Sequence, residues 1–214
     1  MKRPRVLLAD DHRLLTDALK SMLEPECEVV GAVFDGQSLL EEAERLHPDV
    51  VVLDISMPKL NGLDAAKKLK LKKAASKLIF MTMNEDPYLV GEAFRSGASG
   101  FLLKRGAAFE LTDAIGAVLR GGTYVSPEVE AGLTAISQRS PKDRDHAPKP
   151  TARQREVIQL LAEGRSMKSV ADILHITPRT VASHKYGVMA LLQIKSNAEL
   201  IQYAIKQRII SVKP

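Results

Sequence analysis

Short apolar runs alternate with amphipathic segments along the first 125 residues of the chain. Each run holds three to five mostly apolar residues, and the segments between the runs repeat apolar residues every three or four positions. Continuous apolar runs are typical of strands buried on both faces of a parallel sheet. The pattern therefore predicts strands near residues 6–9, 29–33, 50–53, 78–81 and 101–103, with helices near 14–23, 39–46, 65–69, 87–97 and 111–119.

Strict alternation of strands and helices predicts a three-layer α/β domain over residues 1–125, because right-handed crossovers place helices on both faces of a parallel sheet. Residues 126–150 differ in composition. A short helix is expected near residues 127–137, and the segment 137–150, rich in proline and charge, is expected to be an exposed linker.

Only helical patterns follow, over residues 151–214. Thr151 with Gln154, and Ser196 with Glu199, have the spacing of capping boxes, and Thr177-Pro178 is a typical helix start. Four helices in so few residues predict a small all-α domain. Residues 168–192 have the pattern helix, short turn, helix, an arrangement that can place its second helix in the major groove of DNA.

Charge is distributed unevenly between the two predicted domains. The net charge of the chain is +5, but residues 1–125 are nearly neutral, whereas residues 151–214 hold ten Lys and Arg against four Asp and Glu. A basic domain suggests an anionic partner such as double-stranded DNA, although a solvated basic surface explains the charge equally well. The single cysteine, Cys27, and the lack of a long apolar run lead us to expect a cytoplasmic protein that does not span a membrane.

Polar residues stand where the predicted strands end. Asp10 and Asp11 follow the first strand, Asp54 the third, Thr82 the fourth and Lys104 the fifth. Ligands of parallel α/β sheets bind at this edge, and clustered carboxylates suit a hard cation such as Mg²⁺. One of these acids could be a nucleophile that forms an aspartyl phosphate, and Asp54, in the middle of the predicted site, is the best placed. The alternative is that these acids only cap the following helices.

These motifs resemble the receiver domain of two-component response regulators of the NarL/FixJ type. The resemblance covers about residues 4–125 and rests on Asp10-Asp11, residues 54–62 (DISMPKLNG), Thr82 and residues 97–104 (GASGFLLK). It implies a flavodoxin-like (βα)5 fold and a sensor histidine kinase as phosphoryl donor. It further implies the following roles: Asp54 as phosphoacceptor; Asp10, Asp11, Asp54 and the Ser56 carbonyl as Mg²⁺ ligands; Thr82 and Lys104 as phosphoryl contacts; and Thr82 and Phe101 as switch residues. By itself, Phe101 indicates only core packing.

Residues 151–208 resemble the LuxR-type helix-turn-helix domain. The matching residues include the segment 160–164 (LLAEG), Thr180-Val181, His184 and the segment 197–200 (NAEL). The resemblance implies DNA binding and a homodimer. The candidate DNA contacts are Lys168, Arg179, Thr180, Ser183, His184 and Lys185. The sequence departs from the family pattern at Ala182, Tyr186 and Leu191-Leu192, and Ala182 cannot donate a hydrogen bond to DNA.

Three functions are compatible with these features. The first is a phosphorylation-regulated transcription factor. The second is a protein-interaction module whose helical domain has lost or altered its DNA binding, which Ala182 favours and the basic charge of that domain opposes. The third is an aspartyl-phosphate phosphatase, but Ser56 stands where such an enzyme needs a second acid, and the chain shows no cap insertion. We therefore expect a regulator and not an enzyme.

Overall fold

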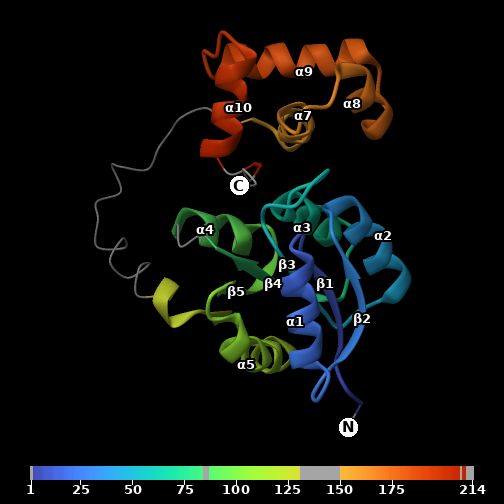
Figure 1. The fold of residues 1–214 in the computed structure, drawn as a ribbon, viewed down its shortest axis with the longest axis vertical. Helices are drawn as coiled ribbons and strands as arrows, with labels where there is room; N and C mark the ends of the chain where they lie inside the picture. Colours follow the sequence, from blue (N-terminus) through green and yellow to red (C-terminus); the bar gives the residue numbers. More distant parts are fainter. Residues whose placement is uncertain (1, 84–86, 131–149, 208, 211–214) are drawn as a thin grey trace.

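The computed structural model describes residues 2–83, 87–130, 150–207 and 209–210. A parallel sheet with the strand order β2-β1-β3-β4-β5-β6 forms the centre of the larger domain (Figure 1). Strand β1 lies in the interior of the sheet, so the chain proceeds outward first to one edge and then to the other. The strands are β1 Arg5–Ala9, β2 Glu28–Val33, β3 Val50–Leu53, β4 Lys77–Thr82, β5 Ala98–Leu103 and β6 Tyr124–Val125.

Helices cover both faces of this sheet. Helices α2 (Gly36–Leu46), α3 (Gly62–Leu71) and α4 (Pro87–Arg95) pack on one face, around a core that includes Phe80 and Phe101. Helices α1 (Arg13–Leu23) and α5 (Ala107–Leu119) pack on the other face. The predicted flavodoxin-like fold is confirmed. The five predicted strands and the five predicted helices are all present. The sequence predicts these strands because each buried apolar run is long enough to be recognised.

The sequence pattern missed the two-residue strand β6, which pairs with β5 at the edge of the sheet. It follows Gly121-Gly122 and is too short to show any periodicity. Of the helix expected near residues 127–137, residues 127–130 are helical. The rest of that helix, and the expected linker up to residue 149, lie outside the described residues.

The smaller domain consists of α7 (Ala152–Ala162), α8 (Met167–Leu174), α9 (Pro178–Leu191) and α10 (Asn197–Lys206). The Thr151–Gln154 capping box is confirmed. The second box is only half correct: Ser196 caps α10, but the Glu199 carboxylate accepts a hydrogen bond from the Lys195 amide instead of the Ser196 amide. Thr177 caps α9, with Pro178 at its first position.

The two domains meet along α7 and α3, at the edge of the sheet where the strands end. Figure 1 shows α7 between α3 of the larger domain and α9, which lies on the side facing away from the sheet. Hydrogen bonds and ion pairs join α7 to α3 and to the loop before it. In the part of the chain that the structure describes, no helix is long and apolar enough to cross a membrane.

Candidate functional site

The fold brings together the polar residues at the ends of four strands. Asp10 directly follows β1, Asp54 follows β3, Thr82 ends β4 and Lys104 follows β5. All four are buried. The Lys104 amide donates a hydrogen bond to the Thr82 carbonyl at 2.9 Å, which joins β4 and β5 at this edge. The fold therefore brings these four polar residues together in one buried cluster.

The Lys104 ammonium lies between two carboxylates. Its Nζ is 2.7 Å from Asp10 Oδ2 and 2.9 Å from Asp54 Oδ2. Burial by itself would lower the pKa of Lys104, but the charges of Asp54 and Asp10 outweigh that effect and raise it. Burial raises the pKa of Asp54, as does the charge of Asp10, against the opposite effect of Lys104. One cation thus keeps two buried carboxylates close together, at an electrostatic cost to Asp54.

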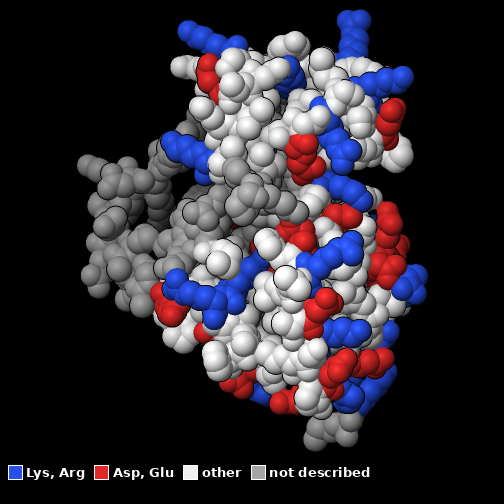
Figure 2. All heavy atoms as spheres, viewed as in Figure 1, with Lys and Arg blue, Asp and Glu red and all other residues white. Residues whose placement is uncertain are grey.

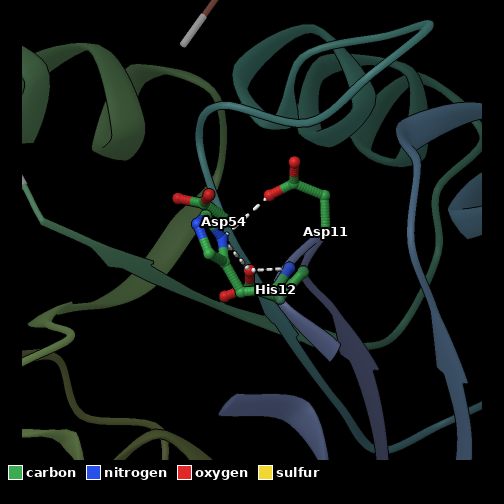
Figure 3. Close-up of side chains that lie close together, drawn as sticks. Asp11, His12 and Asp54 are labelled. Carbon is green, nitrogen blue, oxygen red and sulfur yellow. Dashed lines mark hydrogen bonds and ion pairs between the residues drawn. The ribbon is translucent and has the colours of Figure 1, made fainter. Parts of the chain in front are cut away.

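His12 also lies in this cluster. Its Nδ1 is 2.9 Å from Asp11 Oδ1 and 3.1 Å from Asp10 Oδ1, and its side chain is exposed. In Figure 3 the side chains of Asp11, His12 and Asp54 point toward one another. No sequence signal indicated His12, because a single histidine after two acids is more often an ordinary helix-surface residue.

The acidic cluster is compatible with a divalent cation. One ligand atom from each of Asp10, Asp11, His12 and Asp54 lies within 4.8 Å of the others. Carboxylate oxygens this close repel one another unless a cation joins them, and hard cations such as Mg²⁺ prefer oxygen ligands. The Ser56 residue lies two positions beyond Asp54, in the segment that leads to α3.

Residues 55–61 form the β3–α3 loop, which packs tightly against the start of α3. The Gly62 amide donates to the Ile55 carbonyl at 2.8 Å. A Cβ atom at position 62 would lie 2.0 Å from the Asp54 carbonyl oxygen, a distance that no side chain can occupy. Gly62 therefore allows the helix to begin directly beside the backbone of Asp54.

The proposed switch residues occupy two different settings. Thr82 is buried at the site edge, whereas Phe101 is fully buried in the core, opposite Phe80 in the register of β4 and β5. Phe101 is thus in place to pack beneath the site, as its apolar character predicts. Its role as a switch stays a prediction.

The candidate DNA contacts fall into two groups. Lys168, Arg179 and Ser183 are exposed, and Thr180 and His184 are half-buried on the same helix-turn-helix unit. Lys185 differs, because it is only 9% exposed and faces the interior of the domain. A cavity bordered by Leu161, Met167, Asn197, Leu200 and Ile201 lies against it. An exposed position for Lys185 was expected, so its proposed contact with DNA lacks support from its placement.

The positions that depart from the family pattern lie along α9. Tyr186 is 57% exposed and its ring centroid is 5.1 Å from the Lys185 Nζ, while Leu191 is 38% exposed. Figure 2 shows Lys and Arg side chains projecting from the smaller domain beside a few Asp and Glu side chains, and charges of both signs mixed over the larger domain. Helix α9 itself contains no Asp or Glu. The exposed part of α9 therefore carries only basic and neutral side chains, so no negative charge on this helix would repel a phosphate backbone.

Known proteins match both domains. Residues 6–116 match the family described as "Response regulator receiver domain", and residues 151–204 match "Bacterial regulatory proteins, luxR family". The transcriptional regulatory protein MctR of Rhizobium johnstonii is 34% identical over 97% of this chain and 95% of its own. The transcriptional regulatory protein DegU of Brevibacillus brevis is 30% identical over 98% and 96%.

Solved structures are similar as well. A structure of the RcsB response regulator of Salmonella typhimurium has a TM-score of 0.65 at 27% identity, and covers 95% of this chain and 97% of its own. Another structure, described as two RcsB dimers bound to two parallel DNAs, has a TM-score of 0.60 at 26% identity, with 94% and 98% covered. The similarity therefore extends over both domains.

Proposed function

Because the chain belongs to the response regulators, with a receiver domain followed by a LuxR-type DNA-binding domain, we propose that Asp54 accepts a phosphoryl group and thereby controls DNA binding by α9. The family is one of transcription regulators and not of enzymes. The observation that carries the proposal is the pair of contacts from Lys104 Nζ to Asp54 and Asp10 at the ends of three strands.

The phosphoryl donor is a sensor histidine kinase. A carboxylate oxygen of Asp54 attacks the phosphorus atom, the P–N bond of the donor phosphohistidine breaks, and its electron pair stays on the imidazole. Lys104 neutralises charge on the transferred phosphoryl oxygens, and the Thr82 hydroxyl donates a hydrogen bond to one of them. Both residues already lie at this edge, so little reorganisation is needed.

A Mg²⁺ ion fits the same site. Asp11 and Asp54 would hold it together with the Ser56 carbonyl, and Asp10 would help less directly. When bound, the ion neutralises negative charge that develops on the phosphoryl oxygens. The chain's own contribution is to hold the three carboxylates within reach of one cation.

DNA binding is assigned to the helix-turn-helix unit of α8 and α9. Lys168 and Arg179, which are exposed, would contact phosphates, and Thr180, Ser183 and His184 would face the major groove from α9. A homodimer formed on phosphorylation or on DNA would read two half-sites and bind more tightly than one copy. We expect such a regulator to act in the cytoplasm, where its DNA lies.

The phosphoacceptor is tested with acetyl phosphate and Mg²⁺. The wild type is expected to gain one phosphoryl group by intact-mass spectrometry, whereas Asp54→Asn gains none, because an amide is not a nucleophile here. Asp17→Asn is the matched control, since Asp17 is an exposed residue of α1 outside the site. Equal labelling of Asp54→Asn and the wild type would contradict the assignment.

A further inference from the structure

The core of the smaller domain is divided into two clusters of buried side chains. The first cluster joins α7, α8 and the start of α9 through residues such as Val170 and Val181. The second joins α7, the later part of α9 and α10 through residues such as Val188 and Leu200. The residue between Val181 and Val188 on the buried side of α9 therefore lies at the boundary between the two clusters.

Lys185 is the residue at this boundary. The buried side chains of α9 are those of Val181, Lys185 and Val188, which follow one another at helical spacing. An apolar side chain at position 185 would continue the core, whereas a lysine places an ammonium group there. A buried charge costs stability unless a group of opposite charge neutralises it. Departures of this kind from the core pattern are expected at functional sites.

Lys185 has no anionic partner within the part of the chain that the structure describes. Its ammonium forms no hydrogen bond or ion pair there, and its Nζ lies 5.1 Å from the centroid of the Tyr186 ring. An aromatic face attracts a cation but does not neutralise its charge. The side chain of Arg165, in the turn between α7 and α8, forms no ion pair with a described residue either, although it lies within electrostatic range of Glu163.

A cavity of about 290 Å³ lies beside Lys185. It is bordered by the end of α7, the turn before α8, the middle of α9 and the start of α10. Its apolar wall includes Leu161 from the first cluster, Leu200 from the second, and Ile201. Its lining residues include the cations Lys185 and Arg165 but no Asp or Glu. The cavity thus combines apolar walls with a net positive charge.

We propose that this cavity binds a small organic anion, a carboxylate with a compact apolar body, and that Lys185 pairs with the carboxylate group. The apolar body packs against Leu161 and Leu200 and so bridges the two clusters, while Arg165 adds positive charge from the turn. Pockets for small molecules have volumes of roughly 300–1,000 Å³. A cavity of about 290 Å³ therefore admits a single ring or a short chain and excludes a large cofactor.

Inorganic phosphate matches the cavity less well than a carboxylate does. Its oxygens would each need a donor, and it offers no apolar surface to Leu161, Leu200 and Ile201. An apolar carboxylate satisfies both parts of the wall, because one end is charged and the other is not. Binding neutralises the buried charge and stabilises the smaller domain, since a ligand of the folded state shifts the equilibrium away from the unfolded state.

The site is separate from the phosphorylation site. Asp54 belongs to the larger domain, whereas every residue that lines the cavity belongs to the smaller one. The ligand contacts α9 on the side opposite to exposed residues such as Arg179 and Ser183. It thereby reaches the proposed DNA-binding helix directly, and its binding does not require phosphoryl transfer to Asp54.

The test uses the full chain with benzoate, a single-ring carboxylate, and hexanoate, a short-chain one. Amide chemical shifts in NMR spectra, including those of Leu161 and Leu200, measure the affinity. Benzoate should bind the wild type at least tenfold more tightly than benzyl alcohol, a neutral molecule of similar shape. Lys185→Met keeps the length of the side chain without its charge and should bind benzoate at least tenfold more weakly, whereas Lys185→Arg should retain binding. Lys206→Met, at an exposed lysine of α10, is the matched control and should bind as the wild type does.

Four results would overturn the proposal. They are amides of the cavity that respond to neither benzoate nor hexanoate, equal affinity of Lys185→Met and the wild type for benzoate, benzyl alcohol bound as tightly as benzoate, and inorganic phosphate bound more tightly than benzoate. Asp54→Asn should bind benzoate with the affinity of the wild type, and a loss of binding in this variant would overturn the separation of the two sites. None of these results bears on whether Asp54 accepts a phosphoryl group.

Discussion

We assign function to two surfaces, the edge of the sheet and the exposed face of α9, and they differ in how many of their contacts lie within the chain itself. At the sheet edge, Lys104 already contacts Asp10 and Asp54, and all three side chains are buried. On α9, Arg179 and Ser183 are exposed to solvent. The first site is assembled within one domain, whereas the second, in the proposed function, would be completed only by DNA.

This difference decides how each surface responds to mutation. A buried charge cluster is part of the folded core, so its loss changes both stability and chemistry. Exposed contacts to a phosphate backbone contribute to binding alone, and their contribution depends on salt. The following changes test whether the two surfaces behave in these different ways.

The largest effect is expected from Lys104→Met. This variant should lose labelling by acetyl phosphate and about 3 kcal/mol of unfolding free energy, because Asp10 and Asp54 remain buried without their cation. The pKa of Lys104 lies above its ordinary value in the folded state. Its stabilisation is therefore full at neutral pH and is lost only as the pH rises through that raised pKa. Urea denaturation at neutral and alkaline pH measures both effects, and equal stability of variant and wild type at neutral pH would refute them.

Thr82→Ala tests whether phosphorylation of Asp54 and the change in DNA binding that follows it depend on different residues of the same site. The Asp54 nucleophile and Lys104 remain, so labelling should persist. Loss of the hydroxyl should weaken the phosphorylation-induced gain in DNA binding or dimerisation by about tenfold. Gel shift and analytical ultracentrifugation with and without beryllofluoride, a mimic of the phosphoryl group, measure this gain. Thr123→Ala, at an exposed threonine, is the control, and a full response in Thr82→Ala would exclude the hydroxyl from the switch.

Arg179→Ala addresses the surface that the chain leaves incomplete. It should leave stability unchanged and lower the slope of log affinity against log salt by about 0.9, the loss of one phosphate contact. Arg120→Ala, at an exposed arginine of the receiver, should not change the slope. Should the full chain show no salt-sensitive binding to any DNA in a random library, the altered residue Ala182 has abolished recognition, and the interaction-module hypothesis becomes the better one.

The smallest effect is expected from Lys185→Leu. This variant should change stability but not DNA binding, whereas Arg179→Ala should change DNA binding but not stability. Lys185 is buried beside apolar residues of α7 and α10, so a leucine should raise the unfolding free energy by about 1 kcal/mol. The salt slope of DNA binding should stay the same. A flatter slope in Lys185→Leu would instead restore Lys185 as a phosphate contact.

The sequence predicted the receiver well because its signals are local and repeated. Buried runs such as Val50–Leu53 mark strands, and the ends of parallel strands meet by topology, so the sequence pattern alone is enough to place Asp10, Asp54 and Lys104 together. Strand β6 was missed because two residues carry no periodicity.

Other features depend on contacts that no local pattern contains. Lys185 was expected to contact DNA because α9 is basic, and only the packing of α7 and α10 around it shows that it faces inward. Gln159 of α7, which hydrogen-bonds to the β3–α3 loop, carries no signal either, because a glutamine in an amphipathic helix is ordinary until its partner loop is known. Both cases concern pairs of segments that are far apart in the chain.

The contact between Gln159 and the β3–α3 loop has a consequence for the order in which the protein is made. Synthesis proceeds from the N-terminus, so residues 1–125 can fold before α7 leaves the ribosome. During that interval, water must bind the Met57 carbonyl and the Asn61 amide that Gln159 later binds. A newly made receiver can thus fold before its second domain exists, and α7, the first helix of that domain to be made, meets a loop that is already formed.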